Sequence, residues 1–322
     1  MAGRITTAVV LAAGRGTRLH PITNHRSKAM LPILGVPMIE RILQTLASNG
    51  LKEFIIVARP DDHQLIDYFK SQSPLRRQSQ LVYQVGQKGM ADALLSAAPF
   101  IKDDFILSAC DNFIPAEEIS QFLQAWESKP QLSAALAVIT VAKQKVTSLG
   151  IVSMRGEWVT GIVEKPSPGE APSSIASLPL YCFSPRILDY LPQVKLSPRG
   201  EYELQDAIQM LIEHHGKVCG VFLNQRFSLT VPADLLGINL HFLSLDHDYA
   251  KIRSRRIGPN TRLIPPLHLE TDTVIGSGCT IGPNVYIEQG CQVGGSVIIQ
   301  DSVLLDNVCV PSDTVINHEI LY

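Results

Sequence analysis

An aliphatic residue recurs at every sixth position near the C-terminus of this 322-residue chain, and no position in the series breaks the pattern. The positions are Ile257, Leu263, Leu269, Ile275, Ile281, Ile287, Val293, Ile299 and Leu305. A second series, four residues further on each time, contains small or aliphatic residues, including Cys279, Cys291 and Cys309. A six-residue period with small residues at fixed offsets is typical of a parallel β-helix. The pattern predicts three coils of three hexads each, residues 311–322 as a cap, and the three cysteines as small core residues.

A charged stretch, His247 to Arg256, separates this repeat from the rest of the chain and contains three arginines. The stretch is short and carries no aromatic residue between its arginines. A connector is therefore favoured over the alternative, a patch that binds nucleic acid. The sequence predicts a globular domain at residues 1–245, a linker at 246–256 and the β-helix at 257–322.

Strand-like and helix-like segments alternate through the first third of the chain. Bounded apolar runs predict buried strands, and apolar residues at helical spacing predict helices between them. The predicted strands cover residues 7–13, 54–58, 80–84 and 105–109, and the predicted helices cover 38–48, 61–70 and 90–100. This alternation is typical of an α/β fold with a doubly wound, mostly parallel sheet. Ligands of such sheets bind beyond the carboxyl ends of the strands.

The overall composition argues against several classes of partner. The net charge is −2 and charged residues make up 18% of the chain, so there is no global basic field for nucleic acid. No apolar run approaches the roughly 20 residues of a membrane span, and the apolar run at the N-terminus leads straight into a glycine loop, unlike a signal peptide. The six cysteines form no Cys-x-x-Cys pair. We therefore expect a cytoplasmic protein with reduced thiols that binds neither nucleic acid nor membranes.

The first predicted strand runs into a glycine loop, Gly14-Arg15-Gly16-Thr17-Arg18, and Lys28 follows ten residues later. Glycines allow close approach of the backbone N–H groups to a ligand, and Arg and Lys side chains suit phosphate. The loop predicts a nucleoside triphosphate site, with a plain strand-to-helix turn as the alternative. It is neither a Walker A loop nor a Rossmann fingerprint, whose third glycine is replaced by Leu19.

The run from Leu11 to Leu19, with the downstream lysine, resembles the signature of the sugar-1-phosphate nucleotidylyltransferases, in particular the glucose-1-phosphate thymidylyltransferase-like members. Ser27 stands where the family usually has a proline before that lysine. The resemblance implies a Rossmann-like doubly wound domain followed by a left-handed β-helix. It also implies catalytic roles for Arg18 and Lys28. The nucleotide-binding residues that it implies in this run are Leu11, Ala13, Gly14, Gly16 and Thr17.

Two further segments resemble motifs of the same family. Residues 84–93 resemble the segment that recognises the base, which implies that Gln84 and Gly89 contact it; a Gln amide offers both a donor and an acceptor. Cys110-Asp111-Asn112 resembles the family's Gly-Asp-Asn, whose aspartate holds Mg²⁺, and a carboxylate suits this hard cation. An ordinary surface turn is the alternative for each segment.

The sugar side is implied by segments that follow in the family's order. The resemblance assigns the sugar phosphate to Asn112, Gly150, Glu164 and Lys165. The run Glu201 to Ile208 resembles a further family segment and is expected to open a helix that lines the sugar side.

The chain departs from the family pattern at the second metal position. Many relatives carry an aspartate there, and the alignment places Ser228 on it. A neutral hydroxyl is a poorer Mg²⁺ ligand than a carboxylate. Either Asp206 substitutes as the ligand, or Asp111 alone suffices, or activity is weak or absent. A second departure, Leu178-Pro179-Leu180-Tyr181, lacks the glycine that relatives often have before the aromatic residue.

These motifs favour an enzyme that joins a sugar 1-phosphate, expected to be glucose 1-phosphate, to an NTP, with dTTP or UTP favoured. The products are a nucleotide sugar and pyrophosphate, the cofactor is Mg²⁺, and the β-helix is expected to support a homo-oligomer. Three alternatives stay open: a non-catalytic subunit that binds nucleotide or sugar, a mannose-1-phosphate guanylyltransferase, and a bifunctional enzyme whose β-helix transfers acyl groups with His268 or His318 as base.

Overall fold

The computed structural model of the protein describes residues 5–322, which divide into two compact units. The first unit contains the chain up to Arg15 together with Ile39–Arg226. The second contains Gly16–Met38 and Phe227–Tyr322. None of the helices within residues 5–322 combines the length and the apolar character that crossing a membrane requires.

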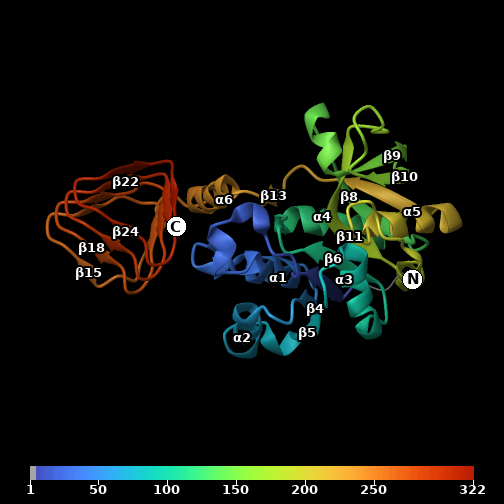
Figure 1. The fold of residues 1–322 in the computed structure, drawn as a ribbon, viewed down its shortest axis with the longest axis horizontal. Helices are drawn as coiled ribbons and strands as arrows, with labels where there is room; N and C mark the ends of the chain where they lie inside the picture. The colour runs from blue at the N-terminus through green and yellow to red at the C-terminus, as the bar shows by residue number, and fades with distance from the viewer. Residues whose placement is uncertain (1–4) are drawn as a thin grey trace. The chain divides into compact units, whose positions relative to one another are not determined.

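The first unit is built on a nine-stranded sheet of order β5-β4-β1-β6-β11-β8-β12-β10-β9 (Figure 1). Strands β5, β4, β1 and β6 run parallel, whereas β11 pairs antiparallel with both β6 and β8, and β10 pairs antiparallel with β9. The strands are β1 Thr7–Leu11, β4 Glu53–Ala58, β5 Ser79–Tyr83, β6 Phe105–Ala109, β8 Ala134–Thr140, β9 Gly150–Arg155, β10 Trp158–Glu164, β11 Ile175–Phe183 and β12 Val218–Phe222. The α/β, doubly wound sheet expected from the sequence is confirmed.

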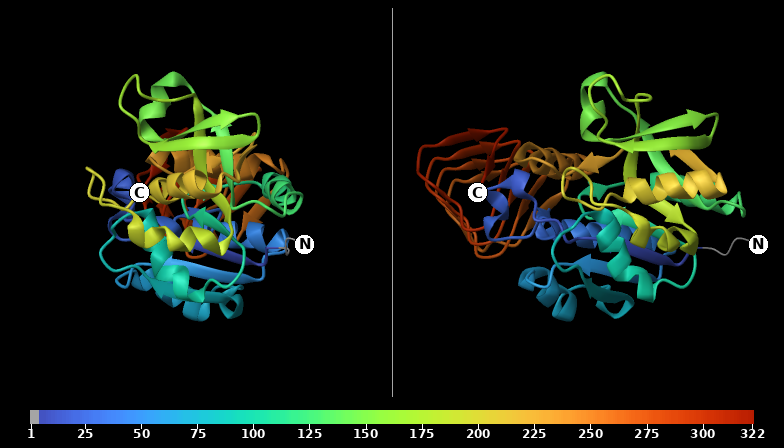
Figure 2. Two further views of the ribbon diagram at one scale, coloured as in Figure 1. Left: turned by 90° about the vertical axis from the view of Figure 1, so that its right-hand side faces the viewer. Right: turned by 45° about the vertical axis from the view of Figure 1, so that its right-hand side comes forward.

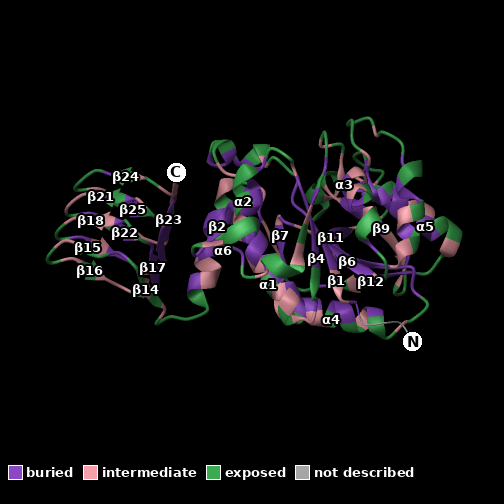
Figure 3. Ribbon diagram, turned by 90° about the horizontal axis from the view of Figure 1, so that it is seen from below, coloured by how far each residue is buried: buried purple, intermediate pink, exposed green. Residues whose placement is uncertain are grey.

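The helices of the first unit bury apolar faces against this sheet. Helix α3 packs on β1 and β4, and α5 packs on β10, and both contribute to the core cluster that includes Val9, Leu107 and Val218. Figure 3 shows the central strands buried along their length. The bounds are α1 Met38–Ser48, α2 His63–Ser71, α3 Met90–Ala97, α4 Ala116–Glu127 and α5 Leu204–His215, with 3₁₀ helices at Arg76–Gln78, Ala98–Phe100, Lys143–Ser148, Pro185–Asp189 and Leu191–Gln193 and the short strand β7 at Asn112–Phe113.

The second unit begins with the segment that carries the end of the glycine loop. Its 3₁₀ helices are Thr17–Leu19, Ile22–Asn24 and Lys28–Met30, and its strands β2 and β3 are Pro32–Ile33 and Val36–Pro37. After β13, Phe227–Ser228, helix α6 spans Pro232–Ser244. Helix α6 packs on β2 and on β20, β23 and β26 of the β-helix, so it contacts both the N-terminal segment and the repeat.

The repeat forms three parallel sheets, consistent with the left-handed β-helix expected from the sequence (Figures 1 and 2). The sheets are β14-β17-β20-β23-β26, β15-β18-β21-β24 and β16-β19-β22-β25. The strands are β14 Ala250–Ile252, β15 Arg256–Ile257, β16 Arg262–Leu263, β17 Leu267–Leu269, β18 Val274–Ile275, β19 Thr280–Ile281, β20 Val285–Ile287, β21 Gln292–Val293, β22 Ile298–Gln300, β23 Ser302–Leu304, β24 Cys309–Val310, β25 Val315–Asn317 and β26 Ile320–Leu321. Strands therefore lie both in the range expected to be a linker and in the range expected to be a cap.

One cysteine departs from its expected place because the repeat loses a residue. Val274 pairs with Gln292, eighteen residues on, whereas Gln292 pairs with Cys309, seventeen residues on. The later coil is thus one residue shorter, and a shift of one residue turns a side chain to the other face of a strand. Cys279 and Cys291 are buried as expected, but Cys309 is exposed and Val308 packs against the core instead.

Candidate active site

Three of the predicted motifs follow strands at one edge of the parallel half of the sheet. Ala13 follows β1, Gln84 follows β5 and Asp111 follows β6. Main-chain hydrogen bonds extend the ladder beyond the strand ends: Ala12 N donates to Val57 O at 2.8 Å, and Cys110 N donates to Leu11 O at 3.0 Å. This edge is where parallel sheets bind their ligands.

The loop after β5 is fastened to the end of β1. Gln87 Nε2 donates to Ala13 O at 2.7 Å. The buried Gln84 amide donates to Gly89 O at 3.0 Å and to Asp92 Oδ2 at 2.8 Å. Its two N–H groups thus hold the loop, and Oε1 is the amide atom that is left to accept a further hydrogen bond. Both amide donors of Gln84 are therefore used within the protein, and the expected contact of Gln84 with a base stays a prediction.

Gly89 is required by its protein neighbours. Its φ is +101°, a conformation that side-chain-bearing residues rarely adopt, and an added Cβ would lie 2.5 Å from Tyr202 O. The two backbones are joined here, since Tyr202 N donates to Lys88 O at 2.7 Å and Ala91 N donates to Tyr202 O at 3.1 Å. Glycine at this position therefore allows the loop of residues 84–90 to lie directly against residues 201–203.

Asp111 stands at one end of a short chain of hydrogen bonds. Asn112 Nδ2 donates to Asp111 Oδ1 at 2.7 Å, and Arg226 Nη1 donates to Asn112 Oδ1 at 3.0 Å. Burial lowers the pKa of the Arg226 guanidinium, and the charge of Asp111 opposes that change. Asn112, expected at the sugar phosphate, is thus oriented by a cation on one side and a carboxylate on the other.

The donors near Asp111 suit a metal ion that takes most of its ligands from elsewhere. A carboxylate oxygen is the ligand type that Mg²⁺ prefers, and Mg²⁺ commonly keeps waters and substrate phosphates in its shell. Among residues 5–322, no three His, Cys, Asp or Glu side chains are grouped closely enough to hold a metal ion by themselves. The residues present therefore fit a cation held by one carboxylate together with triphosphate oxygens.

Gly150 and Glu164 face each other across the β9–β10 pair. An added Cβ at Gly150 would lie 2.9 Å from Glu164 Oε2, so a larger residue there would displace this carboxylate from its observed position. Lys165 Nζ lies 3.4 Å from Glu164 Oε1, whereas Oε2 is buried and has no hydrogen-bond partner within the described chain. Burial raises the pKa of Glu164, and Lys165 opposes that rise. A buried acceptor of this kind suits a ligand hydroxyl.

Asp206 lies near the start of α5, close to a second carboxylate. Burial raises its pKa, the charge of Glu203 adds to the rise, and Arg199 opposes it. Glu203 is itself held by Arg199 Nη2 at 2.8 Å and by Ser197 Oγ at 2.9 Å. The structure thus groups Asp206 with Glu203 and Arg199, while its suggested role as a metal ligand stays a prediction.

In the second unit, Gly16 brings the loop beside the predicted catalytic lysine. Its φ is +69°, and an added Cβ would lie 3.0 Å from Lys28 Cβ. Thr23 Oγ1 donates to Gly16 O at 2.9 Å and fixes the loop. Lys28 is buried, whereas Thr17 and Arg18 are exposed.

Two further residues singled out from the sequence, Ser228 and His268, lie in the second unit. Ser228 ends β13 and is half-buried. His268 is fully buried: its Nδ1 lies 3.2 Å from Tyr249 Oη and its Nε2 lies 2.8 Å from Glu270 Oε1. Burial lowers the pKa of His268, and Glu270 opposes this. An imidazole enclosed in this way favours a structural role over that of a base for acyl transfer.

Sequence reasoning missed three residues that shape these motifs: Gln87, Tyr202 and Arg226. Gln87 lies inside a segment that was singled out, and Tyr202 lies inside another, but their contacts join loops far apart in the chain. Arg226 lies two residues before the aligned Ser228, and no local pattern relates it to Asn112, which precedes it by 114 positions.

Comparison with known proteins identifies the family of this chain. A family model described as nucleotidyl transferase matches residues 7–226, more than half of the chain. The chain belongs to the nucleotidyl transferase family. A second model, described as the GMPPB C-terminal domain, matches residues 263–321, which lie in the β-helix of this nucleotidyl transferase.

Curated relatives agree with this assignment. The "Bifunctional protein GlmU" of Methanococcus maripaludis strain S2 is 32% identical over 279 residues, covering 86% of this chain and 62% of that protein. The protein of the same name in strain C7 is 33% identical over 239 residues, covering 74% and 54%. A UTP–glucose-1-phosphate uridylyltransferase of Bacillus subtilis is 28% identical over 274 residues, covering 76% and 93%. This nucleotidyl transferase therefore spans 54–62% of the length of the two Methanococcus relatives.

Solved structures share the fold. A UDP-glucose pyrophosphorylase in complex with UDP-glucose superimposes with a TM-score of 0.68 at 23% identity, covering 75% of this nucleotidyl transferase and all of that chain. A UDP-glucose pyrophosphorylase from Acinetobacter baumannii gives a TM-score of 0.63 at 24% identity, covering 74% and 93%. At these identities the likeness establishes the fold alone.

Proposed function

We propose that the protein joins a sugar 1-phosphate to a nucleoside triphosphate and releases pyrophosphate. An oxygen of the sugar phosphate attacks the α-phosphorus in line, a new P–O bond forms, and the bond from the α-phosphorus to the bridging oxygen of the β-phosphate breaks. The observation that supports this most directly is the placement of Ala13, Gln84 and Asp111 at one edge of the parallel strands, in a member of the nucleotidyl transferase family. Such chemistry depends on positioning and charge neutralisation rather than on a covalent intermediate.

In this proposal, the glycine loop and the nearby cations bind the triphosphate. The backbone N–H groups at Gly14, Gly16 and Thr17 bind phosphate oxygens, with Leu11 and Ala13 beneath the nucleotide. Arg18 and Lys28 neutralise charge on the triphosphate and on the transition state. Support comes from the left-handed conformation of Gly16, which seats the loop beside Lys28 within the second unit.

Asp111 is the residue proposed to hold Mg²⁺. When bound, the ion neutralises charge on the triphosphate. Asp111 keeps its carboxylate oriented through the Asn112 amide, and Arg226 holds that amide from the other side. Ser228 and Asp206 are the weaker candidates for a second protein ligand.

Glu164 is proposed to accept a hydrogen bond from a sugar hydroxyl. The support is its buried Oε2, which has no hydrogen-bond partner among residues 5–322. The backbone at Gly150 leaves room beside it, and Lys165 places a cation 3.4 Å from the other oxygen for the sugar phosphate. Asn112 approaches the same phosphate in this proposal.

Glucose 1-phosphate and UTP are the proposed substrates. The support is the activity for which relatives such as the B. subtilis UTP–glucose-1-phosphate uridylyltransferase are named. The test is a panel of UTP, dTTP, GTP and ATP against glucose 1-phosphate and mannose 1-phosphate, scored by pyrophosphate release. Release with GTP and mannose 1-phosphate alone would identify a guanylyltransferase instead. Binding of nucleotide without release from any pair would identify a non-catalytic subunit.

Arg18→Ala is expected to lower turnover by roughly 10²-fold or more, the scale for the loss of a charged contact to the transition state. The side chain is exposed, so the thermal unfolding midpoint should stay within experimental error of the wild type. Arg77→Ala, an exposed arginine in the 3₁₀ helix Arg76–Gln78, is the matched control and should keep full turnover. Turnover of Arg18→Ala within threefold of the wild type would contradict the assigned role.

Glu164→Gln is expected to raise KM for glucose 1-phosphate by about tenfold or more, the scale for a hydrogen bond to a charged group, and to leave KM for UTP unchanged. Because burial raises the pKa of Glu164, the wild-type KM should climb as pH falls through that raised value, where the carboxylate gains a proton. The glutamine variant should show only the titration of the substrate itself.

The stability of the Glu164→Gln variant separates this role from a structural one. A raised pKa in the folded state means that ionised Glu164 opposes folding at neutral pH, and protonation relieves the penalty at low pH. The glutamine variant should therefore unfold at neutral pH no more easily than the wild type. Glu170→Gln, an exposed carboxylate nearby in sequence, is the control. A KM that is unchanged in Glu164→Gln would exclude the contact with the sugar.

We propose further that the protein is a cytoplasmic homo-oligomer. All six cysteines carry free thiols, which suits a reducing compartment. Ile298 and Val315 are register partners on one β-helix sheet, and both are exposed, at 40% and 67%. Adjacent apolar side chains of this kind support burial against a second copy of the chain.

A further inference from the structure

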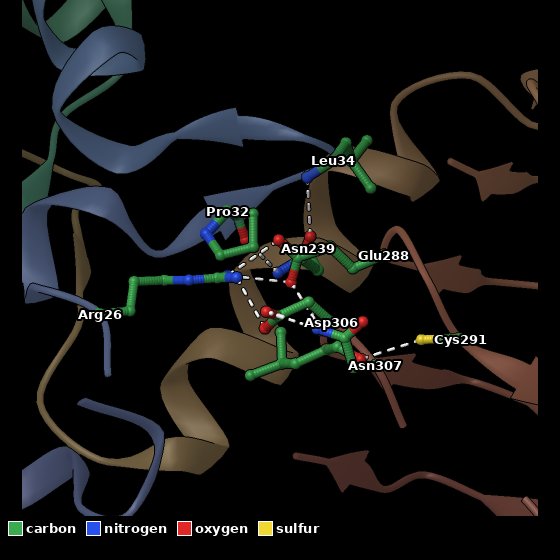
Figure 4. Close-up of polar contacts among 9 residues, drawn as sticks. Arg26, Pro32, Leu34, Asn239, Glu288, Cys291, Asp306 and Asn307 are labelled. Carbon is green, nitrogen blue, oxygen red and sulfur yellow. Dashed lines mark hydrogen bonds and ion pairs between the residues drawn. The ribbon is translucent and has the colours of Figure 1, made fainter. Parts of the chain in front are cut away.

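The segment that carries two of the proposed catalytic cations belongs to the same unit as the β-helix. Gly16–Met38 contains both Arg18 and Lys28, and it forms one compact unit with Phe227–Tyr322. Arg26 stands two residues before Lys28, and its ion pairs lie within this unit (Figure 4). The contacts that hold this segment in place therefore also affect the position of Lys28.

Arg26 forms a largely buried ion network with two β-helix carboxylates. Its Nη1 lies 2.9 Å from Glu288 Oε1, and its Nη2 lies 2.7 Å from Asp306 Oδ1. Only 11% of the Arg26 side chain and 12% of the Glu288 side chain are exposed. The backbone N–H of Asp306 donates to Glu288 Oε2 at 3.0 Å, which gives this carboxylate a second partner.

The bidentate, multiply bonded arrangement restricts both partners. Arg pairs planar carboxylates through a rigid fork, so its orientation is set by the acids that it meets. Breaking one side of a buried pair leaves a charge without compensation, which is strongly unfavourable. The network therefore ties the Arg26 side chain to the β-helix.

A second attachment joins the same segment to α6. Leu34 N donates to Asn239 Oδ1 at 2.9 Å, and Asn239 Nδ2 donates to Pro32 O at 3.2 Å and to Leu235 O at 2.9 Å. Asn239 is fully buried, and its amide oxygen and amide nitrogen both bond to backbone groups. Figure 4 shows this amide between the N-terminal segment and the helix.

The β-helix sheet that contacts α6 is covered on its outer face. The outward residues of β17, β20 and β23 are His268, Tyr286 and Val303, and each is fully buried. The corresponding outward residues on another sheet, Gln292 and Cys309, are exposed. Next to His268, the Glu270 carboxylate lies against Gly35, and a Cβ added at that position would require the Glu270 side chain to move. The covered sheet is thus the surface against which the segment is built.

We propose that the β-helix positions the catalytic segment, and that Glu288 and Asp306 act through Arg26 to set the place of Lys28. They are positioning residues, since they act on the reaction through another group. This inference rests on the proposed function, because it takes Lys28 as a group that neutralises charge in the transition state. It assigns the β-helix a role in turnover in addition to any role in assembly.

The decisive experiment measures turnover and amide hydrogen exchange on the full-length chain. Glu288→Gln should lower kcat by roughly tenfold or more, since small misplacement of a catalytic group is costly, with KM for UTP changed by less than about threefold. Hydrogen exchange should become faster at the amides of Met30, Leu31 and Leu34. The first two donate hydrogen bonds within the segment, and the third donates to α6. Glu319→Gln, an exposed carboxylate of the last coil, is the control and should change neither readout.

A charge-reversal pair keeps the test decisive if a single variant folds poorly. Arg26→Glu and Glu288→Arg should each lower kcat. The double variant, built together with Asp306→Asn so that no second carboxylate faces the new charge at position 26, should recover most of it, because the pair of opposite charges is restored. Normal exchange in residues 28–34 of Glu288→Gln, or a double variant no better than the singles, would overturn the proposal. If the wild type releases no pyrophosphate, the proposed function fails, and the exchange data alone decide whether Arg26 anchors the segment.

Discussion

Asp111→Asn is expected to lower pyrophosphate release by roughly 10³-fold or more, since a metal ion supplies several kcal/mol of charge stabilisation and each 1.36 kcal/mol is a factor of ten. The substitution keeps the shape of the side chain and removes its charge. The amide oxygen can still accept the hydrogen bond from Asn112 Nδ2, so the loop after β6 should keep its conformation. The loss is therefore expected in catalysis and metal binding rather than in folding.

The measurement is pyrophosphate release against Mg²⁺ concentration, together with calorimetric titration of Mg²⁺ in the presence and absence of UTP. Within residues 5–322 no three metal-binding side chains are grouped together, and the site offers one carboxylate. We therefore expect weak Mg²⁺ affinity without nucleotide and strong coupling between Mg²⁺ binding and UTP binding. Asp103→Asn, at the opposite end of β6, is the matched control. Full activity in Asp111→Asn would show that the metal lies elsewhere.

Ser228→Asp is the complementary variant. If Ser228 stands at the second metal position, a carboxylate there should tighten Mg²⁺ binding and raise turnover at low Mg²⁺, because it adds a charged oxygen ligand. An unchanged Mg²⁺ dependence would show that the alignment at this position is wrong. Asp206 would then be the next residue to substitute.

Ending the chain after Leu245 is expected to have the second largest effect. The truncation removes Glu288 and Asp306, which bind Arg26, and uncovers the face of α6 that packs on the β-helix. We expect a lower assembly state or lower solubility, and a loss of turnover greater than the loss of nucleotide binding. The first unit retains residues 84–93, which are proposed to bind the base, and it retains Asp111. Some UTP binding should therefore persist. Light scattering, calorimetry and pyrophosphate release measure the three quantities.

A variant of the whole chain isolates assembly from folding. Ile298→Asp combined with Val315→Asp places two charges on the exposed apolar face, which should dissociate an oligomer that uses it and leave the unfolding midpoint nearly unchanged. Gln292→Asp, on a different sheet of the β-helix, is the control. A truncated chain that is soluble, of unchanged assembly state and equally active would contradict the role given to the β-helix.

Local pattern proved sufficient for the elements that lead to the site. The expected helix at 38–48 and the strand at 105–109 are the observed α1 and β6, and Asp62 Oδ1 accepts a hydrogen bond from Leu65 N at 3.1 Å at the start of α2. Apolar spacing and a capping side chain act within one or two turns of chain, so they are legible in the sequence. The roles of the predicted site residues remain predictions, although the structure fixes where each residue stands within its own unit.

The exposure of Cys309 shows where a pattern stops being enough. The hexads continue in phase through Leu305, yet the last coil closes over seventeen residues instead of eighteen. Val308 takes the inward position and Cys309 turns outward. The sequence period predicts a coil, but the pairing with the coil before it decides which residue faces inward, because register is a property of two strands.

What the sequence determined by itself is the identity and order of the elements: alternating strands and helices, a glycine loop after the first strand, and a six-residue repeat. What only the tertiary structure decided is how distant residues share a role. Arg26 meets Glu288 across 262 positions, Arg226 meets Asn112 across 114, and Gly89 is constrained by Tyr202. The physical reason is that short-range backbone preferences repeat along the chain and leave a period, whereas an ion pair or a close backbone approach between remote segments is set by packing and leaves no local trace.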